Sequence, residues 1–460
     1  MWVYLARRLL LMIPTLLGVT LVVFAVMASS PGGISAQSLV EGQNLEPQAK
    51  KALEDYYNRL YGLDQPAALQ YLRWLSSVSP VGFDIDENGE LGDFNWLKPS
   101  DLGRSFRYGR AVDDLVLERL PATLLLNVLS LPLIYVLAIG IGVNAAAHAG
   151  SRFDRFSGTT MLVFWSVPTM LAGILLIGFF ANEQYWHWFP TAGLSERVAL
   201  DMRFMPHWSS VGDAVLAVSI VIASVVAGYL ALALRSPTLR MAMTSIAGLV
   251  LGGLMIGSSN TAPGILAAGL ILLVVALPVA MLALISSDVL RHAAGVALGL
   301  FAGLIAVLAL AQPEFERGFL LDRLWHLVLP VVCLSYGGLA FLMRLTRSTV
   351  LENLSADYAR TARAKGAHES DVLWGHVFRN SLLPLITVSA SLLPGLLAGS
   401  VIVESIFSID GMGKLAIEAV QGRDRELVLS ITLVSGILTL AGNLVADICY
   451  AVADPRVSYE

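Results

Sequence analysis

Residues 357–366 read Asp357-Tyr-Ala-Arg-Thr-Ala-Arg-Ala-Lys-Gly366 and open a charged island between two apolar segments. Tyr358 and Ala362 are four residues apart, so this half of the island can form a short helix with one apolar face. Gly366 follows it directly. Because glycine has no Cβ, it can adopt the left-handed conformation that ends a helix, and it lets another surface approach closely.

A second short helix is predicted after the glycine. The chain continues as Ala367-His-Glu-Ser-Asp-Val-Leu-Trp-Gly-His376. Val372 and His376 are four residues apart, and so are Trp374 and Phe378, which places each pair on one face of a helix. The island is therefore predicted to hold two short helices that meet at a glycine.

The composition indicates a polytopic membrane protein. Of the 460 residues, 56% are hydrophobic and only 14% are charged, whereas about one quarter of a soluble domain is charged. The two cysteines, Cys333 and Cys449, lie in apolar segments, so neither a disulfide framework nor a metal site is predicted. The N-terminal residues 1–29 carry two arginines before a long apolar run, which we interpret as a retained first span rather than a signal peptide.

Apolar runs of about twenty residues, the length that crosses a bilayer, occur about ten times. The predicted fold is therefore all-α: an integral membrane bundle of about ten helical spans. Their approximate limits are 9–29, 120–147, 159–181, 211–234, 241–258, 262–286, 292–311, 324–344, 382–407 and 427–452. In the third span, Pro168 predicts a kink.

The arginines predict how these spans are oriented. If the N-terminus is cytoplasmic, every cytoplasmic connection is basic, through Arg152 and Arg155, Arg235 and Arg240, Arg291, the stretch 344–379, and Arg456. The external connections 259–263 and 312–316 carry few or no basic residues. The positive-inside rule then predicts an even number of spans with both termini in the cytoplasm.

A polar region, 31–119, separates the first two spans and is predicted to fold outside the membrane. Residues 47–59 and 65–78 have the apolar spacing of helices. Between these helices lies the run Tyr61-Gly-Leu-Asp-Gln-Pro66, and Leu102-Gly-Arg-Ser-Phe106 follows later. Glycine, Asp64 and Pro66 in this order are typical of a turn followed by a helix start.

The run Tyr358 to Gly366 resembles the EAA loop of ABC-type import permeases, most closely the form found in dipeptide and oligopeptide permeases. That loop is a coupling helix that sits in a cleft of a separate ATPase subunit. Arg360-Thr361-Ala362 stands where the general motif has Glu-Ala-Ala, a departure that the peptide branch shares, so no role of the Glu is transferred. The resemblance implies an ATPase-coupling loop formed by Tyr358, Arg360, Thr361, Ala362, Arg363, Ala364, Lys365 and Gly366.

The resemblance extends over about 1–200 and 320–460, where runs such as Arg119-Leu-Pro-Ala-Thr-Leu124 also match the family pattern. It implies a six-span type I ABC importer core. The sequence departs from the family pattern at about 203–311, where four further spans are inserted that serve either as a peripheral packing bundle or for regulation or partner docking. The predicted parts are a first span at 1–30, an extracytoplasmic domain at 31–119, core spans 2 and 3 at 120–202, the inserted four-span region at 203–311, and core spans 4 to 6 at 312–460 with the coupling loop at 345–381.

The same resemblance implies the partners and the location. A second related permease, two ABC ATPase subunits and an extracytoplasmic solute-binding protein are expected, in a bacterial inner membrane and without nucleic acid. ATP and magnesium are expected in the ATPase subunits, with no cofactor bound by this chain. Peptides are the leading solute, although metal chelates, sugars and opines are carried by similar permeases.

Sequence motifs distinguish a chain that hydrolyses ATP itself or is driven by an ion gradient from one that depends on a separate ATPase. A P-loop needs Gly-x-x-x-x-Gly-Lys-Ser/Thr, but Gly413-Lys414 has Ser408 at the first glycine position and Leu415 after the lysine. An ion-coupled secondary transporter is the alternative, since the four extra spans are unexplained. Such a transporter is expected to carry carboxylates or broken helices in corresponding places of two halves, whereas these spans are nearly free of charge.

Glu404, near the end of the fifth core span, is the candidate residue for lining the translocation pathway. Ionisable groups at membrane depth usually face protein or water, because burial in lipid is costly. The alternative is that Glu404 already lies in the outer interface, where a carboxylate is ordinary. Asp447 in the last span is a weaker candidate because it is close to the cytoplasmic end.

Overall fold

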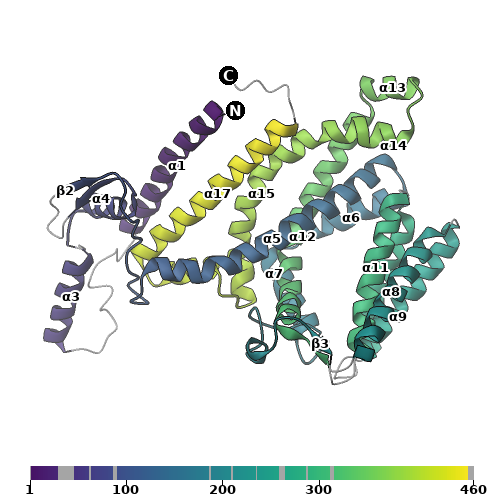
Figure 1. Ribbon diagram of the computed structural model, residues 1–460, viewed down its shortest axis with the longest axis horizontal. Helices are drawn as coiled ribbons and strands as arrows, with labels where there is room; N and C mark the ends of the chain where they lie inside the picture. The colour runs from purple at the N-terminus through teal and green to yellow at the C-terminus, as the bar shows by residue number, and fades with distance from the viewer. Residues whose placement is uncertain are drawn as a thin grey trace. The chain divides into compact units, whose positions relative to one another are not determined.

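The computed structural model is almost entirely helical (Figure 1). It describes residues 2–29, 46–61, 64–85, 91–185, 188–208, 211–234, 236–257, 265–285, 288–310 and 315–453. The predicted external connection 259–263 lies outside these residues, as do most of 312–316 and Arg235 and Arg456. The described chain divides into two compact units. Unit 1 holds 1–125, 386–405 and 410–460, and unit 2 holds 126–385 and 406–409.

In unit 1 the first and last helices, α1 (Trp2–Ser29) and α17 (Arg425–Ala453), run side by side (Figure 1). Arg8 forms an ion pair with Asp447 at 3.2 Å. A polar group among apolar helices is costly unless it is paired, so Asp447 serves here to join the two helices.

The segment between the first two spans forms two helices and a hairpin. Its elements are α3 (Pro47–Tyr61), α4 (Ala67–Val78), β1 (Gly82–Ile85) and β2 (Leu91–Asn95), the two strands being antiparallel. Both helices predicted here are confirmed within two residues at each end. In α4, Tyr71 and Trp74 are buried against Phe24 and Leu429, which attaches this segment to the membrane helices of unit 1.

The run Leu102 to Phe106 is fixed to the start of α17 by one carboxylate. Ser105 Oγ donates a hydrogen bond to Asp424 at 2.5 Å, and the same carboxylate accepts from the Arg107 amide at 3.1 Å. Its other oxygen accepts from the Leu427 amide, so Asp424 also caps α17. Beside this contact, α5 (Val112–Ala147) begins, and its Leu115 packs with α16 (Met412–Gln421).

In unit 2 the third predicted span is broken. Helix α6 (Arg152–Ser166) and helix α7 (Thr169–Leu176) meet at 99°, and a π-helical turn, η1 (Ile177–Ala181), follows. Pro168 disfavours helical geometry in the residue before it, and Val167 is extended. The kink predicted at Pro168 is therefore confirmed as a complete break. Tyr336 of α12 (Gly318–Leu354) donates to the Val167 carbonyl at 2.6 Å, satisfying a group that the break releases.

The predicted inserted region contains four α-helices within the described residues: α8 (Val211–Ala233), α9 (Pro237–Gly257), α10 (Ile265–Met281) and α11 (Asp288–Leu310). A 3₁₀ turn, η3 (Leu282–Leu284), follows α10, and another, η2 (Val198–Asp201), precedes α8. Helices α8 and α11 pack backbone to backbone, since a methyl group on Gly228 or Gly295 would overlap the facing main chain. Short strands β3 (His207–Trp208) and β4 (Phe315–Glu316) pair at the entrance and exit of this region.

Six helices among the described residues are long and apolar enough to cross a membrane, and the bent pair α6–α7 makes seven if it is one span. These six are within α1, α5, α8, α11, α12 and α17. The remaining predicted spans correspond to α9, α10 and α15 (Arg379–Ile406), which are helical. The predicted helical membrane fold is thus confirmed, and the count of ten spans stays a prediction.

Candidate functional site

The predicted coupling loop begins directly after α12 and folds back onto it. Its first helix, α13 (Asp357–Ala364), buries Ala359 and Ala362 against Val350 of α12 and Val143 of α5. Tyr358, expected on the apolar face, instead has 38% of its surface exposed. The two buried alanines are three residues apart, so the contact face of α13 is rotated by one position from the predicted pair.

The glycine that separates the two halves has the predicted conformation. Gly366 has φ of +83°, a left-handed geometry that L-residues rarely adopt. Its amide donates to the Arg363 carbonyl at 2.9 Å, and the Ala367 amide donates to the Ala362 carbonyl at 3.2 Å. This pair of bonds is the Schellman motif, which closes a helix at a glycine. The prediction of two short helices that meet at Gly366 is confirmed.

The second half differs from the prediction in its periodicity. It begins as α14 (Glu369–Asp371) and continues as a π-helix, η4 (Val372–Phe378). A π-helix is wider than an α-helix, with hydrogen bonds between residues five apart rather than four, and the buried pair here is Val372 and Val377, both fully buried. The predicted pairing of Val372 with His376 is therefore wrong. Trp374 contacts the Phe378 ring but remains 41% exposed.

An ion pair joins the two halves across the glycine. Arg363 Nε lies 2.7 Å from Glu369 Oε1, and the same guanidinium donates to the Leu354 carbonyl at 3.2 Å. The hydrogen bond from Arg363 holds the pKa of the Glu369 carboxyl below its ordinary value. Arg363 therefore fastens α13 to the end of α12 and to the start of α14.

A second polar connection runs from α13 to α15. The Tyr358 hydroxyl hydrogen-bonds to Asn353 Oδ1, and Asn353 Nδ2 donates to Ser381 Oγ at 3.0 Å. Ser381 in turn donates to the Val377 carbonyl at 2.9 Å. Sequence reasoning missed Asn353, Ser381 and Glu369, because polar residues outside the matched run carried no signal of partnership.

The predicted residues consequently have two roles in the geometry of the loop. Ala362 is buried and Arg363 is half-buried, and both attach the loop to neighbouring helices. The exposed ones are Tyr358, Arg360, Thr361, Ala364, Lys365 and Gly366. The outward face is short and cationic. The Tyr358 hydroxyl on this face hydrogen-bonds to Asn353. Such a face suits contact with another protein.

Glu404, the predicted pathway residue, is fully buried at the end of α15. Its carboxylate accepts a hydrogen bond from Thr123 Oγ1 at 2.7 Å and from the Lys414 amide at 3.0 Å. Ser400 and the Gly413 amide also donate to it. The Lys414 ammonium lies elsewhere, 2.9 Å from Asp410. Neutral donors thus surround the Glu404 carboxylate.

The run Gly411-Met412-Gly413 fits around that carboxylate. A Cβ on Gly411 would lie 2.5 Å from the Glu404 carboxyl, and one on Gly413 would lie 2.5 Å from the Val401 Cα. Helix α16 begins at Met412, so the carboxylate occupies its N-terminus, where backbone amides lack helical partners. Glu404 therefore holds the start of α16 in place. Its role in lining a pathway stays a prediction.

Comparison with known proteins agrees with this architecture. The family model described as the inner membrane component of binding-protein-dependent transport systems matches residues 248–459, and the N-terminal model of such membrane components matches 1–127. A Brucella abortus (strain 2308) protein that carries the name of a peptide transport system permease is 34% identical over 454 residues, covering 99% of this chain and 98% of that protein.

Two further relatives match over the same extent. The oligopeptide transport system permease protein AppB of Bacillus subtilis (strain 168) is 28% identical over 457 residues, with 99% of each chain covered. The dipeptide transport system permease protein DppB of Escherichia coli (strain K12) is 26% identical over 458 residues, again with 99% of each covered.

The structure has several helices long and apolar enough to cross a membrane and a charged loop that packs on two of them, as expected of a multi-pass membrane protein. The chain belongs to the family of inner membrane components of binding-protein-dependent transport systems. It is the permease subunit of an ABC importer, a transport component and not itself an ATPase. The alternative of an ion-coupled secondary transporter is not favoured.

Proposed function

We propose that this permease carries peptides, or a small solute of similar chemistry, and that residues 357–378 transmit the closing of an ATPase to its spans. The relatives named above support the solute class, since their names describe oligopeptide, dipeptide and peptide transport. The ATPase would bind ATP and magnesium in separate subunits, and this chain would bind no cofactor.

The proposed assembly contains a second related permease, two ABC ATPase subunits and an extracytoplasmic solute-binding protein. Ten spans with both termini in the cytoplasm are supported by the arginines in the predicted cytoplasmic connections, such as Arg152 at the start of α6 and Arg291 near the start of α11. In this orientation 31–119 is external and the coupling loop is cytoplasmic. The inserted helices 203–311 would form a peripheral packing bundle, because α8 and α11 pack so closely on one another.

One observation carries the coupling role, namely that the loop has a fastened face and an exposed face. Ala359, Ala362 and Val377 fix it to α5 and α12, while Arg360 and Lys365 point into solvent. A force on the exposed face is then delivered to the spans rather than absorbed by the loop. ATP closes the ATPase pair, and the loop shifts the spans only if the closed pair binds one of their two arrangements more tightly.

The experiment that tests this function starts from the native membrane. The chain is extracted gently through an affinity tag, and the proteins that accompany it are identified by mass spectrometry. The proposal expects ATPase subunits, a second permease and a binding protein whose sequence narrows the solute. The assembly is then placed in vesicles, where uptake of dipeptides and oligopeptides should require ATP and stop with vanadate.

The contrary result is equally clear. Recovery of the chain without ATPase subunits, together with uptake that needs an ion gradient and ignores vanadate, would overturn the coupling proposal. Vanadate-sensitive uptake of a sugar or metal chelate in place of peptides would keep the coupling and overturn the solute class.

A further inference from the structure

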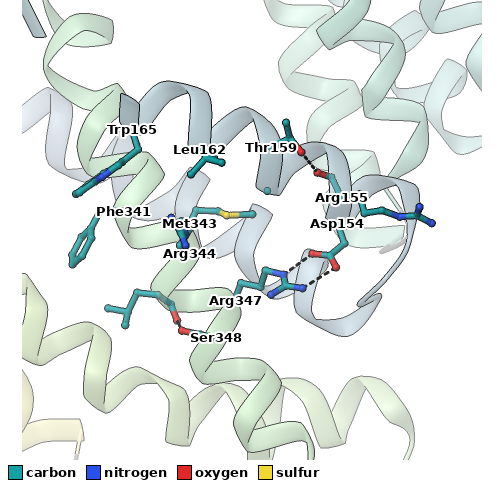
Figure 2. A pocket seen from close by; sticks show the side chains of 12 residues that line it. Asp154, Arg155, Thr159, Leu162, Trp165, Phe341, Met343, Arg344, Arg347 and Ser348 are labelled. Carbon is teal, nitrogen blue, oxygen red and sulfur yellow. Dashed lines mark hydrogen bonds and ion pairs between the residues drawn. The ribbon is translucent and has the colours of Figure 1, made fainter. Parts of the chain in front are cut away.

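A cavity of about 770 Å³ opens between α6 and α12 in unit 2. Figure 2 shows its two ends, with Asp154 and Arg347 joined at one end and Trp165 and Phe341 at the other. The coupling loop and Glu404 do not contribute to its lining. The cavity therefore is a separate site, and its two ends differ in chemistry.

The polar end carries more positive than negative charge. Three arginines line it against one aspartate. Arg347 already pairs with Asp154, at 2.5 and 2.9 Å, and Asp154 also accepts from the Gly150 amide at 2.8 Å. The remaining cations are Arg155, which donates to the Gly150 carbonyl at 3.3 Å, and Arg344.

Arg344 is the cation best placed to hold a ligand. Its side chain is exposed, and within the described residues its guanidinium makes no hydrogen bond or ion pair. In Figure 2 it lies between the ion pair and the aromatic end. Because a guanidinium presents a planar fork of donors that matches phosphate oxygens, this position suits a phosphate group.

The other end of the cavity is apolar and open. The Trp165 ring stacks on Phe341 with centroids 5.7 Å apart, and Leu162 continues the same wall. Trp165 is 56% exposed and Leu162 is 52% exposed. Apolar side chains open at the end of a membrane helix face hydrocarbon chains or a partner helix, whereas a soluble phosphate would leave them uncovered.

We propose that this cavity binds an anionic glycerophospholipid of the cytoplasmic leaflet. The phosphate would meet the Arg344 and Arg155 guanidinium groups, and an acyl chain would lie along Leu162 and the Trp165–Phe341 pair. The Asp154–Arg347 pair closes the polar end and holds α6 against α12. The anionic lipids of the cytoplasmic leaflet give it a negative surface potential. Basic pockets between helices on that side of a membrane bind the head groups of such lipids. The leaflet assignment rests on the proposed orientation of the spans, while the chemistry of the cavity does not.

The test measures lipid binding to the purified importer assembly by native mass spectrometry. The probe is dioleoyl phosphatidylglycerol, with dioleoyl phosphatidylcholine as the neutral comparison. One arginine near a membrane surface contributes about 1 kcal/mol, so Arg344→Gln should weaken phosphatidylglycerol binding about fivefold and leave phosphatidylcholine unchanged. Arg344→Lys keeps the positive charge and should weaken phosphatidylglycerol binding much less.

The matched control is Arg152→Gln, which removes an exposed arginine of α6 that does not line the cavity. It should change phosphatidylglycerol binding by less than twofold. Competition with soluble glycerol phosphate distinguishes a lipid from a soluble phosphate ligand. Only the acyl chain of a lipid can contact the apolar wall, so only the lipid should bind more tightly because of it. Trp165→Ala should therefore weaken lipid binding while leaving any glycerol phosphate binding unchanged.

Three results would overturn the inference. One is equal loss in Arg344→Gln and Arg152→Gln, another is glycerol phosphate binding as tight as lipid, and the third is a partner permease cross-linked at Trp165 in place of lipid. Transport is measured separately on the same preparations. A failure of lipid binding with intact ATP-driven uptake would refute the lipid site alone, and the reverse would refute the proposed function alone.

Discussion

Two glycine-containing turns of this permease use glycine for opposite reasons. Gly366 in the coupling loop has a left-handed backbone with φ of +83°, and a Cβ built on it would meet no atom within 4 Å. Gly411 has an ordinary extended backbone with φ of −110°, but a Cβ there would lie 2.5 Å from the Glu404 carboxyl. One turn needs the conformational freedom of glycine, and the other needs its small volume.

The difference shows how each turn relates to its surroundings. The coupling-loop turn is open, so its surface is available to a partner, and a substitution there acts first through backbone strain. The turn before α16 is closed around a buried carboxylate, and a substitution there acts through steric overlap. Glycines with the same appearance in the sequence should therefore respond to mutation in different ways.

The largest effect is expected at the closed turn. Gly413→Ala would place a methyl group 2.5 Å from the Val401 Cα, a backbone atom that cannot swing away. Overpacking of this kind typically costs 1–3 kcal/mol or more. We expect Gly413→Ala to lower the melting temperature of the purified assembly strongly and to open α16 to proteolysis.

Gly411→Ala is the matched comparison, because its methyl group would overlap only the Glu404 side chain among its nearest atoms. In a double-mutant cycle, adding Glu404→Ala should therefore reduce the loss of stability caused by Gly411→Ala. It should not reduce the loss caused by Gly413→Ala. Relief of both substitutions, or of neither, would contradict the closed turn described above.

The carboxylate itself should give the next largest effect. Glu404→Gln keeps the shape but turns an NH₂ group either toward the Lys414 amide, which cannot accept, or toward the Thr123 hydroxyl, whose own proton then loses its acceptor. A buried donor left without an acceptor costs about 1–3 kcal/mol. We expect a lower melting temperature together with reduced uptake. Normal stability with an altered preference between cationic and anionic peptides would instead support a direct place for Glu404 in the pathway.

At the open turn the expected cost in stability is small. A left-handed backbone costs an L-residue about 1–2 kcal/mol, and asparagine and aspartate tolerate it better than most. Gly366→Asn and Gly366→Asp are therefore a matched pair that differ in charge. Both should keep the spans folded, and Gly366→Asp should weaken ATPase binding further. Full ATPase binding and transport by Gly366→Asp would refute the proposal that residues 357–378 transmit the closing of the ATPase to the spans.

The smallest effect concerns the Arg363–Glu369 ion pair. Because the hydrogen bond from Arg363 lowers the pKa of Glu369 in the folded loop, its stabilisation is complete above the unfolded pKa of about 4.3. It is lost as pH falls through the lower folded pKa. Exposed pairs contribute about 0.2–1 kcal/mol, so Arg363→Gln should increase hydrogen exchange in 357–371 at pH 7 only slightly. The difference in hydrogen exchange between the variant and the original should shrink as pH falls below that unfolded pKa.

Much of this architecture could be predicted from the sequence. Apolar length gave the membrane helices, and Pro168 gave the break in the third span, because both depend on local chemistry. The left-handed Gly366 also followed, since a helix-ending glycine after a basic run has one favoured geometry. In the second half of the loop the four-residue spacing failed, because residues 372–378 form a π-helix that buries Val372 and Val377, and no local preference in the sequence signals it.

The partnerships of polar residues could not be predicted. Glu404 looked like a lone charge at membrane depth, yet its donors include Thr123, about 280 positions earlier, and the backbone of the turn after it. Asn353 and Ser381 have ordinary surroundings in the sequence and meet only through the fold. Such contacts depend on tertiary structure, which hydrophobic periodicity does not encode.

The most direct test of the coupling role is cysteine cross-linking of the loop to the ATPase in the purified assembly. Cys449 is exposed and is first replaced by serine, while Cys333 is buried. Cysteine is then placed at Arg360 or Lys365 on the exposed face, and at Ala359 on the buried face as control. We predict cross-links to the ATPase from Arg360→Cys and Lys365→Cys that change with bound nucleotide, and none from Ala359→Cys. An active assembly in which neither exposed position cross-links to the ATPase would contradict the account.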